Sequence, residues 1–213
     1  MNANLHINRT TSIGKRAFDL ILAVTGLVLC APLAPLIALA IKLESTGPVL
    51  IRQLRVGRAH PDRTELFQML KFRSMVVDAE SISGAVWATK RDPRITKVGY
   101  WLRKTRLDEL PQLINVLLGE MSMIGPRPER PCFYSKLETA IPFFIERTYG
   151  VTPGITGLAQ VNQGYDSCLD DVRSKLGYDL SYALALANTR SWVMMDLNIL
   201  VRTLATMVMG RGQ

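Results

Sequence analysis

Two adjacent acids, Asp108 and Glu109, stand in the stretch RLDELPQLINVLLGEMSMIGPRP, residues 106–128. Pro111 is tolerated in a first helical turn, so we expect the acid pair at a helix N-terminus. The helix dipole favours ionised carboxylates there by about 0.3–1 kcal/mol each. An ionised carboxylate can attack phosphorus, and its neighbour can hold Mg²⁺, which diphosphates usually bring with them. The pair therefore suits phosphoryl transfer, although two acids that only cap a surface helix would have the same pattern.

Three basic residues strengthen the interpretation as a phosphate site. Lys71 in KFRSM, Arg103 in WLRK and Arg127 in GPRP lie outside any amphipathic repeat. Pro126 and Pro128 fix the backbone on both sides of Arg127, and a rigidly held guanidinium suits bidentate contact with phosphate. Each of these cations alone is most often a solvated surface charge. Together with the acid pair, they indicate a site for a charged diphosphate.

Composition limits the architecture and suggests an anionic partner. With 213 residues, the chain can form one domain with a core, or one domain plus a membrane element. Lys and Arg number 26 against 18 Asp and Glu, a net charge of +8. The segment from Lys42 to Arg106 holds 14 basic and 6 acidic residues and so carries the whole excess. Nucleic acid, an anionic bilayer and a phosphorylated small molecule all satisfy this charge.

Cysteine and histidine usage argues against other kinds of site. The three cysteines, Cys30, Cys132 and Cys168, lie far apart without a CxxC pair, which predicts neither a disulfide framework nor a zinc site. The two histidines, His6 and His60, stand in polar stretches, so histidine-based catalysis is not expected. Free thiols fit a reducing, cytosol-facing compartment.

One apolar segment is long enough to cross a bilayer. From Leu20 to Ile41 the chain has 22 residues without a charge, more than the core of a secretory signal peptide. Pro32 and Pro35 remove backbone donors in its middle, which predicts a break near Ala31 and two half-helices. Both flanks are basic, with Lys15 and Arg16 before the segment and Lys42, Arg52, Arg55 and Arg58 after it.

Basic flanks on both sides place both ends of this segment in the cytoplasm by the positive-inside rule. A re-entrant hairpin, which dips into one leaflet and returns, satisfies that rule. An ordinary proline-kinked transmembrane helix is the alternative, and a buried helix of a soluble core is a third.

The rest of the chain reads as a mixture of helices and a hairpin. Apolar alternation in residues 49–57 and 65–75, around the turn-like HPDR, predicts a short β-hairpin. Residues 74–96 are polar and predict a loop or short helix, and residues 153–162 a turn with a short strand or loop. The segment of residues 191–210 could pack on the body or lie in the membrane interface. Apolar spacing predicts helices over residues 97–104, 107–118, 168–188 and 191–210.

Taken together, the motifs resemble the bacterial sugar transferases, the monotopic phosphoglycosyl transferases. The resemblance runs from about Ile13 to Met209 and includes, in order, KRAFDLILA, the broken apolar segment, LKFRSM, DPRITKVGYWLRKTRLDELPQLINVLLGEMSMIGPRPE, PGITGLAQVN and GYDLSYA. It implies one mainly helical α+β phosphoglycosyl transferase domain over residues 1–213. Residues 13–44 would form the re-entrant membrane hairpin and residues 45–213 the cytoplasmic catalytic part, with a short β-hairpin and amphipathic interfacial helices.

The resemblance also implies a reaction. Asp108 would attack the β-phosphate of a nucleotide diphosphate sugar, usually a UDP-sugar, and Glu109 would be its acidic partner at Mg²⁺. UMP would leave, and polyprenyl phosphate would then take the phosphosugar, which begins a surface polysaccharide or glycoconjugate. The residues implied in substrate binding are Lys71, Arg103 and Arg127 at the phosphates and, as a weaker candidate, Asp179 of GYD.

The implied partners are a nucleotide sugar, polyprenyl phosphate and inner-leaflet lipids on the cytoplasmic face of the bacterial inner membrane, and no nucleic acid. Both a monomer and a homo-oligomer stay open. Thr152 stands where many relatives carry Arg or Lys, so one phosphate contact would be absent or supplied by Arg147. Two other functions remain as alternatives: a basic membrane-bound adaptor without catalysis, and a glycosyltransferase that moves the sugar alone and releases UDP.

Overall fold

The computed structural model describes residues 7–77, 79, 92–163 and 169–208. These residues form an α+β, mostly helical structure with two small sheets, which confirms the predicted fold class at this level. In chain order the elements are α1 (Arg9–Cys30), α2 (Leu33–Glu44), β1 (Leu50–Ala59), β2 (Thr64–Phe72), α3 (Lys97–Lys104), η1 (Leu107–Glu109), α4 (Gln112–Leu118), β3 (Ser122–Ile124), α5 (Pro131–Ala140), η2 (Phe144–Thr148), β4 (Gly154–Thr156), α6 (Leu158–Asn162), α7 (Leu169–Ala185) and α8 (Thr189–Val208).

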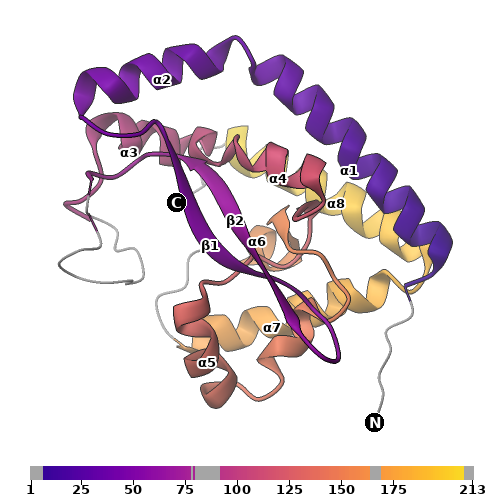
Figure 1. Ribbon diagram of the computed structural model, residues 1–213. Coiled ribbons are helices and arrows are strands. Elements are labelled where there is room, and N and C mark those ends of the chain that lie inside the picture. Colours follow the sequence, from indigo (N-terminus) through magenta and orange to yellow (C-terminus); the bar gives the residue numbers. More distant parts are fainter. Residues whose placement is uncertain (1–6, 78, 80–91, 164–168, 209–213) are drawn as a thin grey trace.

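The apolar N-terminal segment is a broken helix pair, as its prolines predict. α1 ends at Cys30, because Pro32 has no backbone N–H with which to continue the hydrogen bonds of this helix. α2 begins directly after Pro32, at Leu33. The two helices meet at an angle of 61°. Figure 1 shows them arching over the rest of the molecule. Among the described residues no helix is by itself long and apolar enough to cross a membrane, whereas this bent pair is, by length and composition.

The predicted β-hairpin is also present, and a single amide fastens it to α4. β1 and β2 pair antiparallel from Leu50↔Phe72 onward, with an irregularity after Val56. Asn115 of α4, which is 1% exposed, accepts a hydrogen bond from the Leu70 amide at 3.0 Å and donates to the Gln68 carbonyl at 2.9 Å. These bonds hold the strand that carries Lys71 against the helix that follows the acid pair.

An apolar cluster fills the space between the hairpin, α4 and α1. α1 contributes Ala23 to this cluster, which shows that the N-terminal helix packs on the body along part of its length. The buried members are Ala23, Phe67, Met69, Leu113, Val116 and Met121. The strand that carries Lys71 and the helix that follows the acid pair are thus packed in one cluster.

A second sheet consists of the short parallel strands β3 and β4. β4 agrees with the short strand expected within residues 153–162, although α6 follows it there, whereas β3 and its pairing with β4 were not predicted. Ser122 pairs with Gly154 and Ile124 with Thr156. A Cβ on Gly154 would lie 2.1 Å from the Gly125 amide nitrogen, so only glycine permits this approach of the two chains. The pairing fixes the start of the loop that carries Arg127.

α7 and α8 confirm the two C-terminal helices predicted from apolar spacing, and α8 is bound to α1 by a buried polar group. Asp196 accepts hydrogen bonds from Lys15 Nζ at 3.2 Å, Tyr182 Oη at 2.9 Å and Trp192 Nε1 at 2.6 Å. We call these four residues the Asp196 network. Lys15 also donates to the Ile124 carbonyl at 2.9 Å, so the network joins both helices to β3.

Most of the predicted polar loop at residues 74–96 lies outside the described residues, and so does Cys168. Cys30 and Cys132 are free thiols. The predicted helix over residues 97–104 is present as α3.

Candidate active site

The acid pair lies in a turn before a helix, and our prediction of a helix N-terminus is wrong in this respect. Leu107 to Glu109 form the 3₁₀ turn η1, and α4 begins three residues later at Gln112. Arg106 adopts a left-handed conformation with φ 60°, which reverses the chain between α3 and η1. Pro111 is tolerated both in the first turn of a helix and at the position just before it. Here it is the residue before α4, so the α-helix begins after the acid pair and not at it.

Glu109 is buried and surrounded by cations. The residue is only 7% exposed. Its Oε1 accepts hydrogen bonds from Lys71 Nζ at 3.2 Å and from Arg127 Nη2 at 2.9 Å. Arg106 Nη1 lies 3.9 Å from the other oxygen, Oε2. Burial alone would raise the pKa of Glu109, but the charges of Arg127, Lys71 and Arg106 hold that pKa well below its usual range. Glu109 is therefore ionised at neutral pH.

Asp108 is equally buried but has no such partners. It is 7% exposed, and within the described part of the chain its carboxyl group makes no hydrogen bond or ion pair. Burial raises the pKa of Asp108; the charge of Lys71 opposes this rise and that of Glu109 adds to it. We expected a helix dipole to favour the ionised form of both acids. In the structure, the pKa of Asp108 is raised and that of Glu109 is lowered. Asp108 is a desolvated carboxyl group whose oxygens remain available for chemistry.

Two of the three expected phosphate cations contact the acid pair, and the third lies beside it. Lys71 and Arg127 pair with Glu109, as described above. Burial lowers the pKa of Lys71, and the charge of Glu109 opposes that change. Arg103 is half-buried in the last turn of α3, has no ion pair among the described residues, and its charge acts to lower the pKa of Asp108. All three cations are thus grouped around two carboxylates.

The loop that presents Arg127 is held by donors from two other elements. Arg147 donates from Nη2 to the Arg127 carbonyl, and Arg55 donates from Nη1 to the Pro128 carbonyl at 3.1 Å. The Val56 amide donates to the Glu129 carbonyl at 2.9 Å. The proline-flanked guanidinium therefore sits on a backbone that is fixed from both sides.

Asp179 lies behind this loop. Its Oδ2 is 3.1 Å from Arg147 Nε, and both side chains are almost completely buried. Arg147 also pairs with Glu129 at 3.5 Å. Because the Arg147 charge already faces two carboxylates, it is poorly placed to replace a cation at Thr152. Asp179 supports the Arg127 loop through Arg147, and its direct contact with substrate stays a prediction.

Arg55 is a site residue that sequence reasoning missed. Burial, and then the charge of Arg127, lower the pKa of Arg55 to about 10, and the charge of Glu109 opposes them. The signal was present in the strand alternation: Ile51 is the partner of Lys71 and Arg55 the partner of Phe67, so Arg55 and Lys71 point to the same face of the hairpin. In the sequence analysis, Arg55 appears only as one of the basic residues that flank the apolar segment.

Comparison with known proteins now decides the family. A sequence model of the family described as bacterial sugar transferase matches residues 10–210 of this chain. The chain belongs to the bacterial sugar transferase family. This confirms the resemblance drawn from the motifs, and the match includes every element that builds the acid-pair site.

Individual relatives carry informative names. A protein of Aeromonas hydrophila named UDP-N-acetylgalactosamine-undecaprenyl-phosphate N-acetylgalactosaminephosphotransferase is 43% identical over 198 residues, which are 93% of this chain and 44% of that protein. An undecaprenyl-phosphate glucose phosphotransferase of Komagataeibacter xylinus is 41% identical over 93% of this chain and 36% of its own length. The exopolysaccharide production protein PSS of Rhizobium leguminosarum is 37% identical over 93% of this chain and 97% of its own length.

The relatives differ in how much of their own length this chain covers, which limits what their names imply for it. This chain spans less than half of the Aeromonas and Komagataeibacter proteins, but it matches nearly the whole Rhizobium protein. The sugar transferase domain is therefore the part that they share.

Proposed function

We propose that this chain transfers a sugar 1-phosphate from a nucleotide diphosphate sugar, a UDP-sugar, to polyprenyl phosphate. The names of the sugar phosphotransferase relatives support this activity. The observation that carries it in this chain is the contrast within the acid pair: Lys71 and Arg127 both pair with one carboxylate oxygen of Glu109, whereas Asp108 is buried and has no partner among the described residues. The product, a polyprenyl-diphosphate-linked sugar, would be the first lipid intermediate of an exopolysaccharide or glycoconjugate.

The proposed chemistry has two displacements at one phosphorus atom. A carboxylate oxygen of Asp108 attacks the β-phosphorus of the UDP-sugar, the bond from that phosphorus to the bridging oxygen breaks, and UMP leaves with the electron pair. A phosphate oxygen of the polyprenyl phosphate then attacks the same phosphorus, and the Asp108 carboxylate leaves. Two steps at one nucleophile let a small site serve a soluble donor and a lipid acceptor in turn.

The cations suit the charge that the donor brings. Arg103 has no ion pair among the described residues, so it can meet a phosphate oxygen without breaking an existing bond. Arg127, one third of whose side-chain surface is exposed, lies at the rim with one bond to Glu109. Lys71 is more enclosed than Arg127, and it pairs with Glu109. We propose that Arg103 and Arg127 bind the diphosphate and that Lys71 holds the acid pair in place.

The donor set also suits Mg²⁺. The described residues contain no group of three or more metal-binding side chains, but Mg²⁺ commonly uses one or two carboxylates together with substrate phosphates and water. Glu109 Oε2, which is 3.9 Å from its nearest cation, and the unpartnered Asp108 carboxyl group fit that requirement. We propose that Glu109, with Asp108, holds Mg²⁺ when the diphosphate is bound. The ion would offset phosphate charge and favour departure of UMP.

We further propose that α1 and α2 form a re-entrant hairpin on the cytoplasmic face of the bacterial inner membrane, within a single domain. Basic flanks and the 61° bend support this arrangement. Apolar side chains on neighbouring helices extend the proposed membrane surface, since Trp101 of α3, Leu118 of α4 and Val201 of α8 are 60–67% exposed. The exposed apolar residues of the helix pair itself include Ile21, Val24, Val28, Leu29, Leu36, Leu39 and Leu43.

The nucleotide product tests the function. The full chain in detergent micelles receives a panel of UDP-sugars with polyprenyl phosphate and Mg²⁺, and both products are identified by mass spectrometry. UMP together with a polyprenyl-diphosphate-sugar is the expected result. UDP as the nucleotide product would instead establish a glycosyltransferase, and absence of any lipid-linked sugar across the panel would favour the adaptor.

A further inference from the structure

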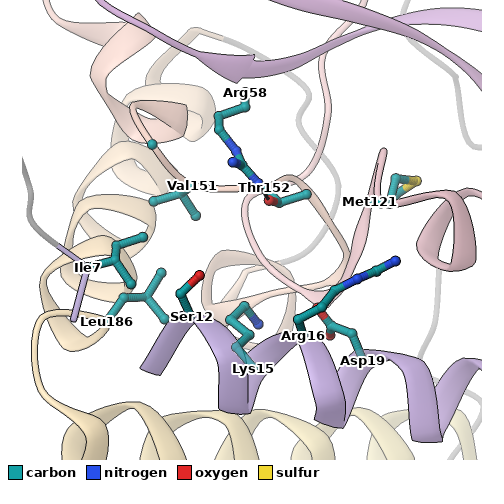
Figure 2. Close-up of a pocket in the computed structure, with 12 residues that line it drawn as sticks. Ile7, Ser12, Lys15, Arg16, Asp19, Arg58, Met121, Val151, Thr152 and Leu186 are labelled. Carbon is teal, nitrogen blue, oxygen red and sulfur yellow. Dashed lines mark hydrogen bonds between the residues drawn. The ribbon is translucent and has the colours of Figure 1, made fainter. Parts of the chain in front are cut away.

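A cavity of about 260 Å³ opens between the first turns of α1, the end of β1 and residues 150–152 (Figure 2). Lys15, Arg16 and Asp19 line it from α1, and Arg58 reaches it from β1. Figure 2 shows the Arg58 side chain extending from the hairpin toward the Thr152 side chain and the α1 residues. The cavity is therefore lined by three cations and one carboxylate, none of which belongs to the acid-pair site.

Two of these cations carry charge that no carboxylate balances. Arg16 donates to the carbonyls of Val116 at 2.6 Å and Leu117 at 2.9 Å, and Arg58 donates from Nη2 to the Thr152 hydroxyl. All three acceptors are neutral, and neither guanidinium has an ion pair in the part of the chain that the structure describes. Their positive charge therefore acts on the cavity.

Arg58 also has an unused donor. Its Nε atom is buried and has no hydrogen-bond partner among the described residues. A buried donor without a partner is destabilising, and an acceptor that enters the cavity would remove that penalty. The unpartnered nitrogen is thus a second indication, independent of net charge, that the cavity takes an acceptor.

The remaining charged groups of the cavity are already occupied. Lys15 pairs with Asp196 at 3.2 Å. Asp19 accepts hydrogen bonds from Ser122 Oγ at 3.0 Å and from the Met123 amide at 2.9 Å. These bonds hold the only lining carboxylate against β3, so it does not neutralise either guanidinium.

The cavity is separate from the acid pair, because the two lie at opposite ends of α4. Asp108 and Glu109 precede the first residue of this helix, whereas the cavity borders Gly119 at its C-terminal end. Seven residues at a rise of about 1.5 Å each place the two ends roughly 10 Å apart. A phosphate bound at Asp108 therefore does not fill this cavity.

We propose that the cavity binds a phosphate-bearing group between Arg16 and Arg58, in addition to the substrates of the proposed reaction. Guanidinium groups match phosphate geometry, and each retains N–H donors beyond those already used. The volume lies just under the roughly 300–1,000 Å³ of pockets for larger ligands, which suits a phosphate with a small body such as glycerol. Val151 and Leu186 supply an apolar wall for that body.

Two sources carry this chemistry. α1 continues beyond Asp19 into the apolar segment, so the headgroup of an anionic phospholipid can reach the cavity from the proposed membrane surface. Free phosphate from the cytoplasm is the other source. Phosphatidylglycerol and inorganic phosphate are accordingly the two probes.

The test measures the melting temperature of the full chain in non-ionic detergent. We expect a rise of several degrees with millimolar inorganic phosphate, with phosphatidylglycerol relative to phosphatidylcholine, or with both. A response to phosphate alone identifies the free anion as the source, and a response to phosphatidylglycerol alone identifies the headgroup. Arg58→Gln should lose at least half of the rise. Arg63→Gln is the matched control, since Arg63 lies in the hairpin turn, is 65% exposed, and should leave the rise unchanged.

Two further variants separate this proposal from the proposed function. Arg127→Gln removes a cation at the acid pair and should keep the Arg58-dependent part of the rise, and Asp108→Asn should keep it while turnover is lost. An equal rise in the wild type and Arg58→Gln, or no rise with either probe, would overturn the cavity proposal. If Arg58→Gln does not fold, Arg58→Lys serves instead: it should raise the half-saturating ligand concentration at least fivefold, and an unchanged concentration would contradict the proposal.

Discussion

The acid pair and the Asp196 network are both buried clusters of charge, but they differ in how completely their members are paired. Asp196 accepts three hydrogen bonds, and their donors lie on three helices: Lys15 on α1, Tyr182 on α7 and Trp192 on α8. In the acid pair, Glu109 is paired with Lys71 and Arg127 through one oxygen, whereas Asp108 has no partner among the described residues. A saturated cluster stabilises a fold, and a buried carboxyl group left open is retained for chemistry at a price in stability.

This difference predicts that the same isosteric change has opposite consequences in the two clusters. Removing the charge of Asp108 should abolish activity with the fold intact, and removing the charge of Asp196 should weaken the fold with the chemistry intact.

The largest effect is expected for Asp108→Asn. An amide cannot serve as the nucleophile, so turnover should fall by at least about a thousandfold. Initial rates of lipid-linked sugar formation give the loss, and circular dichroism reports whether the helices are retained. Residual turnover above a tenth of the wild type would remove Asp108 from the role of nucleophile.

Removal of divalent ions should have the next largest effect on activity. EDTA should reduce turnover to background, and added Mg²⁺ should restore it, because the donors at the acid pair are hard oxygen ligands. The melting temperature should hardly change on chelation, since Lys71 and Arg127 already satisfy Glu109 without a metal ion. Full turnover after rigorous chelation would eliminate the metal role of Glu109.

Asp196→Asn should act on stability. The change leaves Lys15 buried without its carboxylate, and breaking a buried ion pair in this way typically costs about 3 kcal/mol or more. Denaturant unfolding in detergent measures the loss. Turnover per folded molecule at a temperature below the transition should stay within about twofold of the wild type, and a selective loss of turnover would show that this network takes part in catalysis.

Substitutions of the two neighbouring acids should change the free energy of unfolding in opposite directions. The pKa of Asp108 is raised in the folded chain, so its ionisation destabilises the fold progressively as pH rises above the unfolded value of 3.8. The pKa of Glu109 is lowered, so its contribution is complete above the unfolded value of 4.5 and is lost as pH falls toward its folded pKa. At pH 7, Asp108→Asn should therefore gain about 0.5–2 kcal/mol, and Glu109→Gln should lose about 3 kcal/mol.

Unfolding curves of both variants and the wild type between pH 4 and pH 8 measure these differences. The gain from Asp108→Asn should shrink as pH falls, because protonation of the wild-type carboxyl group removes the cost of burying its charge. Parallel losses in both variants at pH 7 would show that Asp108 is paired in solution after all.

Local patterns predicted the parts of the fold that local forces decide. Pro32 breaks the apolar helix because a missing donor acts within one turn, and the alternation around HPDR specifies the β-hairpin. The parallel pairing of Ser122 with Gly154 joins three-residue strands that are far apart in the sequence, and no local signal marks it. That pairing became visible only in the folded chain.

The candidate site divides in the same way. The sequence identified the acid pair and its three cations by residue type and motif, but it assigned both acids the same ionisation. The opposite pKa shifts depend on where Lys71 and Arg127 lie in space, because both contact Glu109 and neither contacts Asp108. Sequence spacing does not encode that choice. Arg55 could have been found by following the strand alternation from Lys71, since it lies two pairs further along the same face of the hairpin.

The most direct test of the account is mass spectrometry of the full chain incubated with UDP-sugar and Mg²⁺ in the absence of polyprenyl phosphate. We predict an adduct with the mass of the sugar phosphate on the peptide that contains Asp108, formed with one equivalent of UMP and discharged when polyprenyl phosphate is added. Asp108→Asn should form none, and Glu109→Gln should form it slowly. Absence of the adduct, together with initial-rate plots that intersect as for a ternary complex, would contradict a covalent role for Asp108 and favour direct attack by the lipid phosphate.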